Sequence, residues 1–302
     1  MALPSDPSAN RRGIFALCGA MVGFAINDAL MKLVASRSPI GEAIFIRGMI
    51  AVFLAGTVLV WMGHVPAIRL AANRIVAFRS VMEAIVSVLF VTVLIRLPLA
   101  EISAILLAVP LIMTAMAVIL IREDVGWRRW TAIAVGFAGA LVIVRPGMGA
   151  LASGSLLALL CAFLSASRDF VTRSIDPRIP TIVVSFLSAV SVSLSGLVLG
   201  LWENWRPLPW QDVALLGTAA AFMATGNYLI VIAFRGVDIS VVAPFRYSLL
   251  IWAGLLGYFL FGELPDGWTA LGMAMIVASG LYTLHRERVR KSDVATRVMP
   301  PD

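Results

Sequence analysis

The sequence predicts an all-α integral membrane protein with ten transmembrane helices, arranged as two inverted five-helix repeats. Three observations lead to this prediction: an apolar composition, ten long apolar runs, and a second half that resembles the first. Of the 302 residues, 60% are hydrophobic and 14% are charged, whereas about a quarter of the residues in a soluble domain are charged. The mean hydropathy of +0.95 likewise indicates a chain that is solvated mainly by lipid.

A helix needs about 20 mostly apolar residues to cross a bilayer. The runs that meet this length are 13–34, 41–61, 75–95, 99–121, 128–145, 154–173, 181–201, 212–234, 239–261 and 268–284. They are too long for barrel strands and do not alternate strictly, which argues against a β-barrel. We expect an N-terminal tail (1–12), a first repeat (13–147), a second repeat (152–285) and a C-terminal tail (286–302). The first run is longer than a signal-peptide core, so we expect it to remain as a membrane span.

The distribution of basic residues predicts how the chain lies in the membrane. The net charge is +7, but arginines lie between apolar runs and do not gather with aromatic residues on a soluble face, which argues against nucleic acid as a partner. Most of the 24 lysines and arginines fall on the side that holds the N-terminus, as the positive-inside rule describes for cytoplasmic segments. We therefore expect a multi-pass protein of the cell inner membrane with both termini cytoplasmic. Cys18 and Cys161 lie inside apolar runs and predict no disulfide.

The two halves carry similar residues in the same order, which indicates an internal duplication. Glu101-Ile102-Ser103 near the start of the fourth run corresponds to Asp238-Ile239-Ser240 at the ninth. Gly126-Trp127 opens the fifth run and Gly267-Trp268 opens the tenth, and each pair is followed at the same spacing by Gly139 or Gly280. Asp28 and Lys32 in the first run correspond to Asp169 and Arg173 in the sixth. Because five is an odd number, the two copies must enter the membrane from opposite faces.

Inverted repeats of this kind place a substrate site between the two copies near the bilayer midplane, and exchange of shape between the copies gives alternating access. The pattern Gly196-xxx-Gly200 is one of several in which small residues permit close helix packing.

The chain resembles the EamA-type permeases of the drug/metabolite transporter superfamily over nearly its whole length. The residues that carry the resemblance are Pro110, Glu123, Gly136-Phe137-Ala138-Gly139, Arg145-Pro146-Gly147, Gly262-Glu263 and Gly280. The resemblance implies a ten-helix permease for small organic metabolites. The chain departs from the family pattern at Arg122, where a glycine often precedes the glutamate, and at Leu250, the counterpart of Pro110.

Polar side chains inside the apolar runs are the candidate substrate-binding groups. An ionisable side chain at bilayer depth costs about 2.5–3.5 kcal/mol on the most lenient scale, so it faces a cavity or a partner and avoids lipid. Arg47 and Arg246 come from opposite halves, and guanidinium groups suit bidentate capture of a carboxylate. They are alternatively structural partners for Glu83 or Asp28. The predicted cavity residues are Asn27, Arg47, Glu83, Asn227, Tyr228, Arg246, Tyr247 and Trp252.

Three pairs of charged residues one helical turn apart are candidate gates or ion pairs. We expect Asp28 with Lys32, and Asp169 with Arg173, to form intrahelical salt bridges near opposite mouths of the cavity. Arg79 and Glu83 are spaced for a third pair, although Arg79 is also close enough to its helix end to extend to the cytoplasmic interface.

Among the function classes, the sequence favours a secondary transporter of an amino acid or a related carboxylate, with a vitamin-like aromatic such as a flavin as the alternative substrate. A membrane enzyme is disfavoured, because His64 and His285 fall in a loop and the tail, and no motif supplies a nucleophile or metal ligands. We therefore expect no catalytic residue, metal or cofactor. Asp28 and Glu83 are candidate sites for a coupling proton. Nothing in the sequence specifies an oligomeric state or a direction of transport, and a passive channel stays an open alternative.

Overall fold

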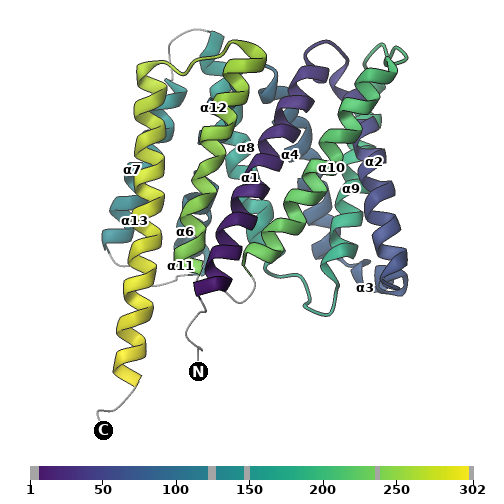
Figure 1. Ribbon diagram of the computed structural model, residues 1–302. Coiled ribbons are helices and arrows are strands. Elements are labelled where there is room, and N and C mark those ends of the chain that lie inside the picture. Colours follow the sequence, from purple (N-terminus) through teal and green to yellow (C-terminus); the bar gives the residue numbers. More distant parts are fainter. Residues whose placement is uncertain (1–6, 122–126, 146–149, 235–238, 299–302) are drawn as a thin grey trace.

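A computed structural model describes residues 7–121, 127–145, 150–234 and 239–298, and every regular element in these ranges is a helix (Figure 1). The elements in chain order are α1 (Pro7–Ala35), α2 (Ile40–Trp61), η1 (Val65–Ala67), α3 (Ile68–Ala71), α4 (Arg74–Leu94), α5 (Leu99–Leu106), α6 (Val109–Ile121), α7 (Trp127–Val144), α8 (Ala150–Thr172), α9 (Thr181–Gly200), α10 (Trp210–Ala233), α11 (Ile239–Val242), η2 (Ala243–Tyr247), α12 (Ser248–Phe261) and α13 (Gly267–Val298).

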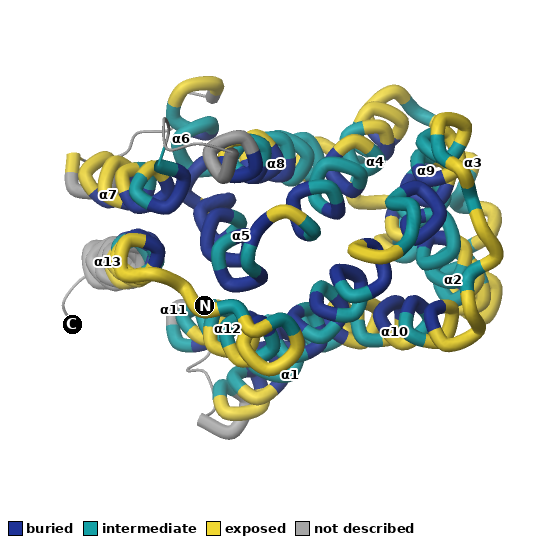
Figure 2. Tube along the Cα trace, turned by 90° about the horizontal axis from the view of Figure 1, so that it is seen from above, coloured by how far each residue is buried: buried dark blue, intermediate teal, exposed yellow. Residues whose placement is uncertain are grey.

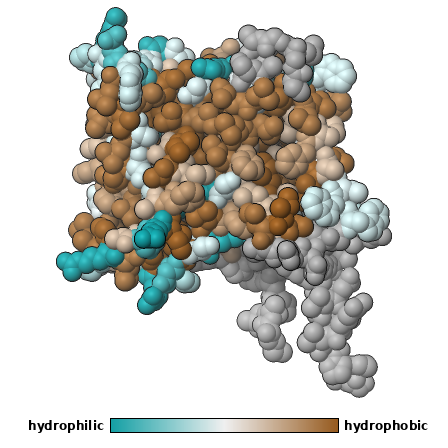
Figure 3. Space-filling view, turned by 180° about the vertical axis from the view of Figure 1, so that it is seen from behind, coloured by the Kyte–Doolittle hydropathy of each residue, from teal (hydrophilic) through white to brown (hydrophobic). Residues whose placement is uncertain are grey.

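Within the described ranges, nine helical segments are long and apolar enough to cross a membrane, and two of them, Leu99–Leu120 and Ala243–Phe261, each join two consecutive elements. The predicted run 128–145 corresponds to α7, whose apolar segment Trp130–Val144 is shorter than these nine. The surface carries a broad apolar area that is bordered by polar residues at its upper and lower edges (Figure 3). The protein is therefore an all-helical membrane protein.

Two of the predicted continuous helices are interrupted. The run 99–121 is divided into α5 and α6 around residues 107–108, and the run 239–261 is divided into α11, the 3₁₀ segment η2 and α12. Proline lacks the N–H that continues an α-helical ladder and crowds the preceding turn. Pro110 at the start of α6 and Pro244 within η2 account for the position of each interruption.

Each contact that α1 makes with helices of the second half has a counterpart that α8 makes with helices of the first half. The contact of α1 with α10 has a counterpart in α8 with α4, and that of α1 with α12 has a counterpart in α8 with α6. Seen from above, α1, α10 and α12 form one long side and α4, α6 and α8 the other (Figure 2). The pair α2 and α9 closes one short end, and the pair α7 and α13 closes the other.

Both closing pairs depend on glycine. A Cβ atom added to Gly196 of α9 would lie 2.5 Å from the Phe45 nitrogen and 2.7 Å from the Gly41 carbonyl oxygen of α2. A Cβ on Gly272 of α13 would lie 2.6 Å from the Gly139 oxygen of α7. These distances confirm the predicted close packing at Gly196 and show the same kind of contact at Gly272.

Four helices begin directly after a proline, namely α2, α5, α9 and α10. Proline offers no side-chain acceptor for the N–H groups of the first turn, which need a partner. Two of these helices are capped by a carboxylate from the other half. Gly41 N donates to both Glu203 oxygens, at 3.1 and 2.9 Å, and Leu99 N donates to Glu263 Oε2 at 2.8 Å.

The start of α1 and the end of α13 lie at the same end of the bundle, which we call the near end (Figure 1). The opposite end, with the connections α1–α2, α4–α5, α9–α10 and α12–α13, is the far end. The largest cluster of buried apolar side chains draws on both halves, for example Leu94 and Ile105 with Leu216 and Ile276.

Candidate functional site

The first part of the candidate site lies between α1 and α2. Arg47 Nη1 donates to Asn27 Oδ1 at 3.2 Å, and Asn27 Nδ2 donates to Asp28 Oδ1 at 2.8 Å. Asn27 is only 3% exposed. The Nε of Arg47 is buried and has no hydrogen-bond acceptor within the described part of the chain. Arg47 therefore retains an unused donor inside the bundle.

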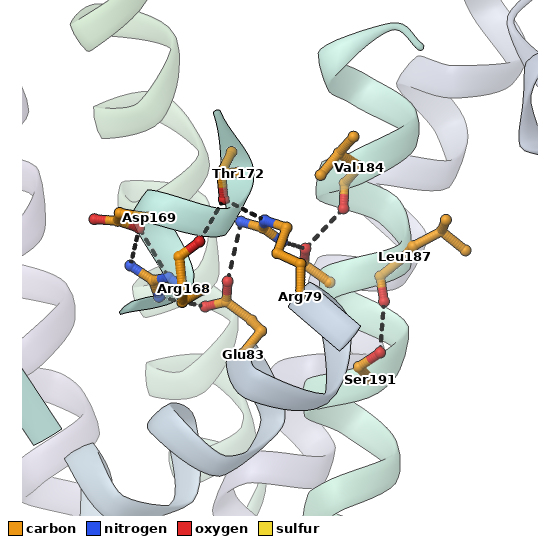
Figure 4. Close-up of polar contacts among 9 residues, drawn as sticks. Arg79, Glu83, Arg168, Asp169, Thr172, Val184, Leu187 and Ser191 are labelled. Carbon is orange, nitrogen blue, oxygen red and sulfur yellow. Dashed lines mark hydrogen bonds and ion pairs between the residues drawn. The ribbon is translucent and has the colours of Figure 1, made fainter. Parts of the chain in front are cut away.

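The second part joins α4, α8 and α9 (Figure 4). Glu83 receives Arg79 Nη2 on one oxygen at 3.1 Å and Arg168 Nη1 on the other at 2.9 Å. Arg168 also contacts Asp169 Oδ1, at 2.9 Å from Nε and 2.8 Å from Nη2. Arg79 Nε donates to Thr172 at 3.1 Å, and its Nη1 donates to Ser188. Glu83 is thus held between arginines of the first and second halves.

The two parts lie on adjoining helices and form one group, because α4 contacts both α1 and α2. We call this group the central ionic network. Its members are Asn27, Asp28, Arg47, Arg79, Glu83, Arg168, Asp169, Thr172 and Ser188. Its three arginines balance its three carboxylates, as expected where unpaired charges would be expensive to bury. Arg79 and Arg168 already have carboxylate partners, whereas Arg47 has only an amide oxygen as a direct acceptor.

Several predicted pairings are replaced by others. The spacing of Arg79 and Glu83 correctly predicts their ion pair, but the Arg79 side chain is only 14% exposed and does not extend to the interface. Lys32 pairs with Glu263 and not with Asp28. Asp169 pairs with its neighbour Arg168, while Arg173 lies over the Phe170 ring, 5.9 Å from its centroid. Intrahelical spacing permits a pair, but a carboxylate from the other half takes Lys32, and the adjacent arginine takes Asp169.

The remaining predicted cavity residues lie apart from the central ionic network. Tyr247 packs against α13, where a Cβ on Gly280 would meet its hydroxyl. Trp252 lines a groove between α1 and α12 with apolar side chains only: Val22, Ile26, Leu255, Leu256 and Phe259. Asn227 and Tyr228 on α10 and Arg246 in η2 are exposed. None of these five has a hydrogen bond or ion pair to the network within the described ranges.

Three members of the network, Arg168, Thr172 and Ser188, are not among the site residues predicted from the sequence. Arg168 lies close to the end of its apolar run, where the positive-inside rule predicts a cytoplasmic arginine. The repeat offered a signal: Arg168 precedes Asp169 just as Asn27 precedes Asp28. Both positions preceding an aspartate supply a polar contact to the network.

The fold and this network define a multi-pass membrane protein with charged groups from both halves held inside an apolar bundle. Comparison with known sequences identifies the family. Residues 11–145 and 152–284 each match the EamA-like transporter family. The chain therefore belongs to that family, within the drug/metabolite transporter superfamily, and is a transporter and not an enzyme.

Relatives with named substrates are similar to this chain at modest identity. An S-adenosylmethionine uptake transporter of Rickettsia prowazekii is 24% identical, covering 89% of this chain and 91% of the relative. A riboflavin transporter of Vibrio cholerae is 33% identical over 60% of this chain and 61% of the relative. The pseudopaline exporter CntI of Pseudomonas aeruginosa is 23% identical over 89% and 94%.

A solved crystal structure aligns with a TM-score of 0.58 and 18% identity, covering 91% of this chain and 96% of the other. At this identity, the similarity supports the fold alone.

Proposed function

We propose that this protein is an alternating-access secondary transporter of a small organic metabolite that bears a carboxylate, such as an amino acid or a related compound. The proposed architecture is ten membrane helices in two inverted five-helix repeats, with α7 as the fifth. The reciprocal packing of α1 with α10 and of α8 with α4 supports a two-fold relation between the halves. The common end of α1 and α13 is consistent with an even number of crossings.

The single observation that carries the proposal is the central ionic network, which recruits charged side chains from both halves inside an apolar bundle. Between inverted repeats, such groups lie where a substrate site forms. Arg47 is the proposed substrate-binding group, because its Nε is buried without an acceptor in the described part of the chain and its hydrogen bond to Asn27 goes to an amide oxygen. A substrate carboxylate would supply the missing acceptor.

Arg246 remains a proposed second contact. It is exposed in the interrupted segment η2 and has no ion pair in the described ranges. Interrupted helices are common where transporters bind substrates. The S-adenosylmethionine relatives favour a substrate with an amino acid group, and the riboflavin relatives favour a flavin as the second candidate.

We place the protein in the cell inner membrane with the near end cytoplasmic, because most basic residues would then be inside. Asp28 and Glu83 stay candidate sites for a coupling proton. Flux measured with and without an imposed pH gradient would test that coupling.

The proposal is tested with purified protein in two steps. A thermal-shift screen against amino acids, S-adenosylmethionine and riboflavin identifies ligands, and counterflow in liposomes then measures their transport. A carrier accelerates exchange of labelled substrate, whereas an open channel does not. Absence of flux for every ligand found would contradict the transport function.

The role of Arg47 has its own variant. We expect Arg47→Ala to lower exchange at least tenfold while the protein still folds. The matched control is Arg178→Ala, which removes an exposed arginine paired with Asp176 in the α8–α9 connection. Unchanged exchange in Arg47→Ala would remove Arg47 from the site.

A further inference from the structure

The contact between Lys32 and Glu263 at the far end is the most enclosed ion pair outside the central ionic network. Lys32 Nζ lies 2.5 Å from Glu263 Oε1 and 2.6 Å from the Leu97 carbonyl oxygen, and 5.0 Å from the centroid of the Phe261 ring. Lys32 is only 6% exposed. Its ammonium is therefore held by a carboxylate, a carbonyl and an aromatic face, which together replace water.

Glu263 uses its second oxygen for a different task. Oε2 accepts from Leu99 N at 2.8 Å, at the first residue of α5, where Pro98 provides no side-chain cap. One carboxylate of the second half thus binds the end of α1 and the start of α5, which both belong to the first half. If the two halves separate at the far end, both contacts must break together.

The Glu263 side chain lies at the end of α12, where its carboxylate can change orientation. Glu263 follows Gly262, which ends α12 with a left-handed φ of +67° and has open space around its Cβ position. Residues 262–266 have no regular structure, but Glu263 N donates to Gly257 O of α12 at 3.0 Å, and Asp266 accepts from Thr269 N at 2.8 Å at the start of α13. The Glu263 backbone is thus held at the end of α12, and rotation about its side-chain bonds can move the carboxylate without disturbing either helix.

Arg173, the residue that corresponds to Lys32 in the second repeat, has the opposite environment. It is exposed and has no ion pair within the described ranges. Glu123, which the repeat matches to Glu263, lies outside the described residues. Inverted repeats that alternate between two shapes are expected to hold equivalent positions in unequal states at any moment.

We propose that Lys32 and Glu263 form the far-end gate of the transporter: the pair closes the passage in this structure and must separate for the far end to open. The proposal rests on the proposed transport function and adds the group that controls access to its site. A permanent structural clamp is the competing explanation, and it predicts that holding the pair together leaves transport unaffected.

The first test needs no substrate, so it can fail independently of the proposed function. Spin labels at Ser36→Cys and Trp268→Cys report the far-end separation of the halves, in a background that carries Cys18→Ser and Cys161→Ala. Ser36 and Trp268 are both exposed. We expect Glu263→Gln, which retains an acceptor for Leu99 N but loses the charge, to add a population with a longer label-to-label distance. Identical distance distributions with and without Glu263→Gln would overturn the gate.

The matched control is Asp176→Asn, which removes a carboxylate from an ion pair in the α8–α9 connection at the near end. It should leave the far-end distances unchanged. A shift as large as that of Glu263→Gln would mean that the labels report general loosening and would overturn the assignment.

The second test holds the pair together. Lys32→Cys with Glu263→Cys is joined by a short thiol-specific cross-linker that a reductant cleaves, and liposome exchange of S-adenosylmethionine and of riboflavin is measured before linking, after linking and after reduction. We expect linking to lower exchange of the transported probe at least tenfold and reduction to restore it. Exchange that persists in fully linked protein would overturn the gate. If neither probe is exchanged before linking, the spin-label result alone decides.

Discussion

Lys32 and Arg173 occupy corresponding positions in the two repeats, but the structure treats them differently. Lys32 at the far end is almost fully enclosed and bonded to Glu263, whereas Arg173 at the near end is exposed and lies over the ring of Phe170. The same position in a repeated sequence thus has two environments in a single structure. The difference teaches that the duplication specifies the helices and their order, while the contacts at each end depend on how the halves are inclined toward each other.

Other contacts at the far end follow the same pattern. Arg37 pairs with Asp212, Arg145 pairs with Asp266, and Gly41 N donates to Glu203; each of these contacts joins the first half to the second. At the near end, the ion pair between Asp176 and Arg178 stays within one connection. In the described part of the chain, the ion pairs that join the two halves therefore lie at the far end and in the central ionic network.

The largest effect on stability is expected from removing an arginine of the central ionic network. Arg168→Leu would leave Asp169 without its cation and Glu83 with Arg79 alone. Loss of one partner from a buried ionic group costs about 3–5 kcal/mol, so we expect a markedly lower melting temperature in detergent. Arg178→Leu is the control, because its side chain is 80% exposed and a surface substitution changes stability by only about 0.5 kcal/mol. Equal melting temperatures for the two variants would contradict a structural role for the network.

The next effect concerns the α2–α9 pair, which runs from one end to the other. Gly196→Ala would place a methyl group 2.5 Å from the Phe45 nitrogen, and overpacking of this kind costs about 1–3 kcal/mol. Gly254→Ala in α12 is the control, because nothing lies within 4 Å of its Cβ position. There, alanine should stabilise the helix by about 1 kcal/mol. The measurement is thermal unfolding. Melting temperatures that fall equally in both variants would argue against the packing of α2 on α9.

The comparison of the two cations is sharpened by making the same change at each. Lys32→Gln leaves Glu263 without its cation in an enclosed place, which we expect to cost about 1–3 kcal/mol. Arg173→Gln changes an exposed side chain without an ion pair in the described ranges, so its effect should lie within about 0.5 kcal/mol. Melting curves of the two variants, recorded side by side in one detergent, provide the measurement. A larger loss of stability in Arg173→Gln than in Lys32→Gln would contradict the proposal that the far end is the closed one.

The smallest effect is a pH dependence at the rim of the far end. The Arg145 guanidinium and the Thr269 N–H hold the pKa of the Asp266 carboxyl below its usual range. A lowered pKa in the folded state stabilises the protein above the unfolded-state pKa of about 3.9, and this contribution is lost as the pH falls through the folded-state pKa. Asp266→Asn should therefore melt slightly below the wild type at pH 7, with the gap narrowing under acid. A gap that widens toward low pH would contradict this sign.

Much of the architecture could be predicted from the sequence, because crossing a bilayer requires long apolar runs and leaves little choice of secondary structure. The positions of the interruptions could not be placed so well. Pro110 was visible within its run and Pro244 within its own, but proline is often accommodated in membrane helices when neighbours satisfy the freed carbonyl groups. Whether a helix bends or divides depends on those neighbours.

The candidate site was predictable only in part. Charges at bilayer depth identified Glu83 and Arg47, and helical spacing identified the pair of Glu83 with Arg79. The same reasoning put Asp28 with Lys32, because spacing along one helix takes no account of a carboxylate far away in the chain such as Glu263. It also placed Tyr247 in a cavity, although its ring packs on Gly280.

The sequence by itself determined that this chain is a helical membrane protein with a duplicated order of apolar runs, since hydropathy and length are local properties of each run. The tertiary structure alone decided which charges meet. A buried ammonium or guanidinium is stabilised by whichever carboxylate the packing of separate helices brings within bonding distance, and the resulting balance of desolvation and attraction depends on three-dimensional proximity and not on spacing along the chain.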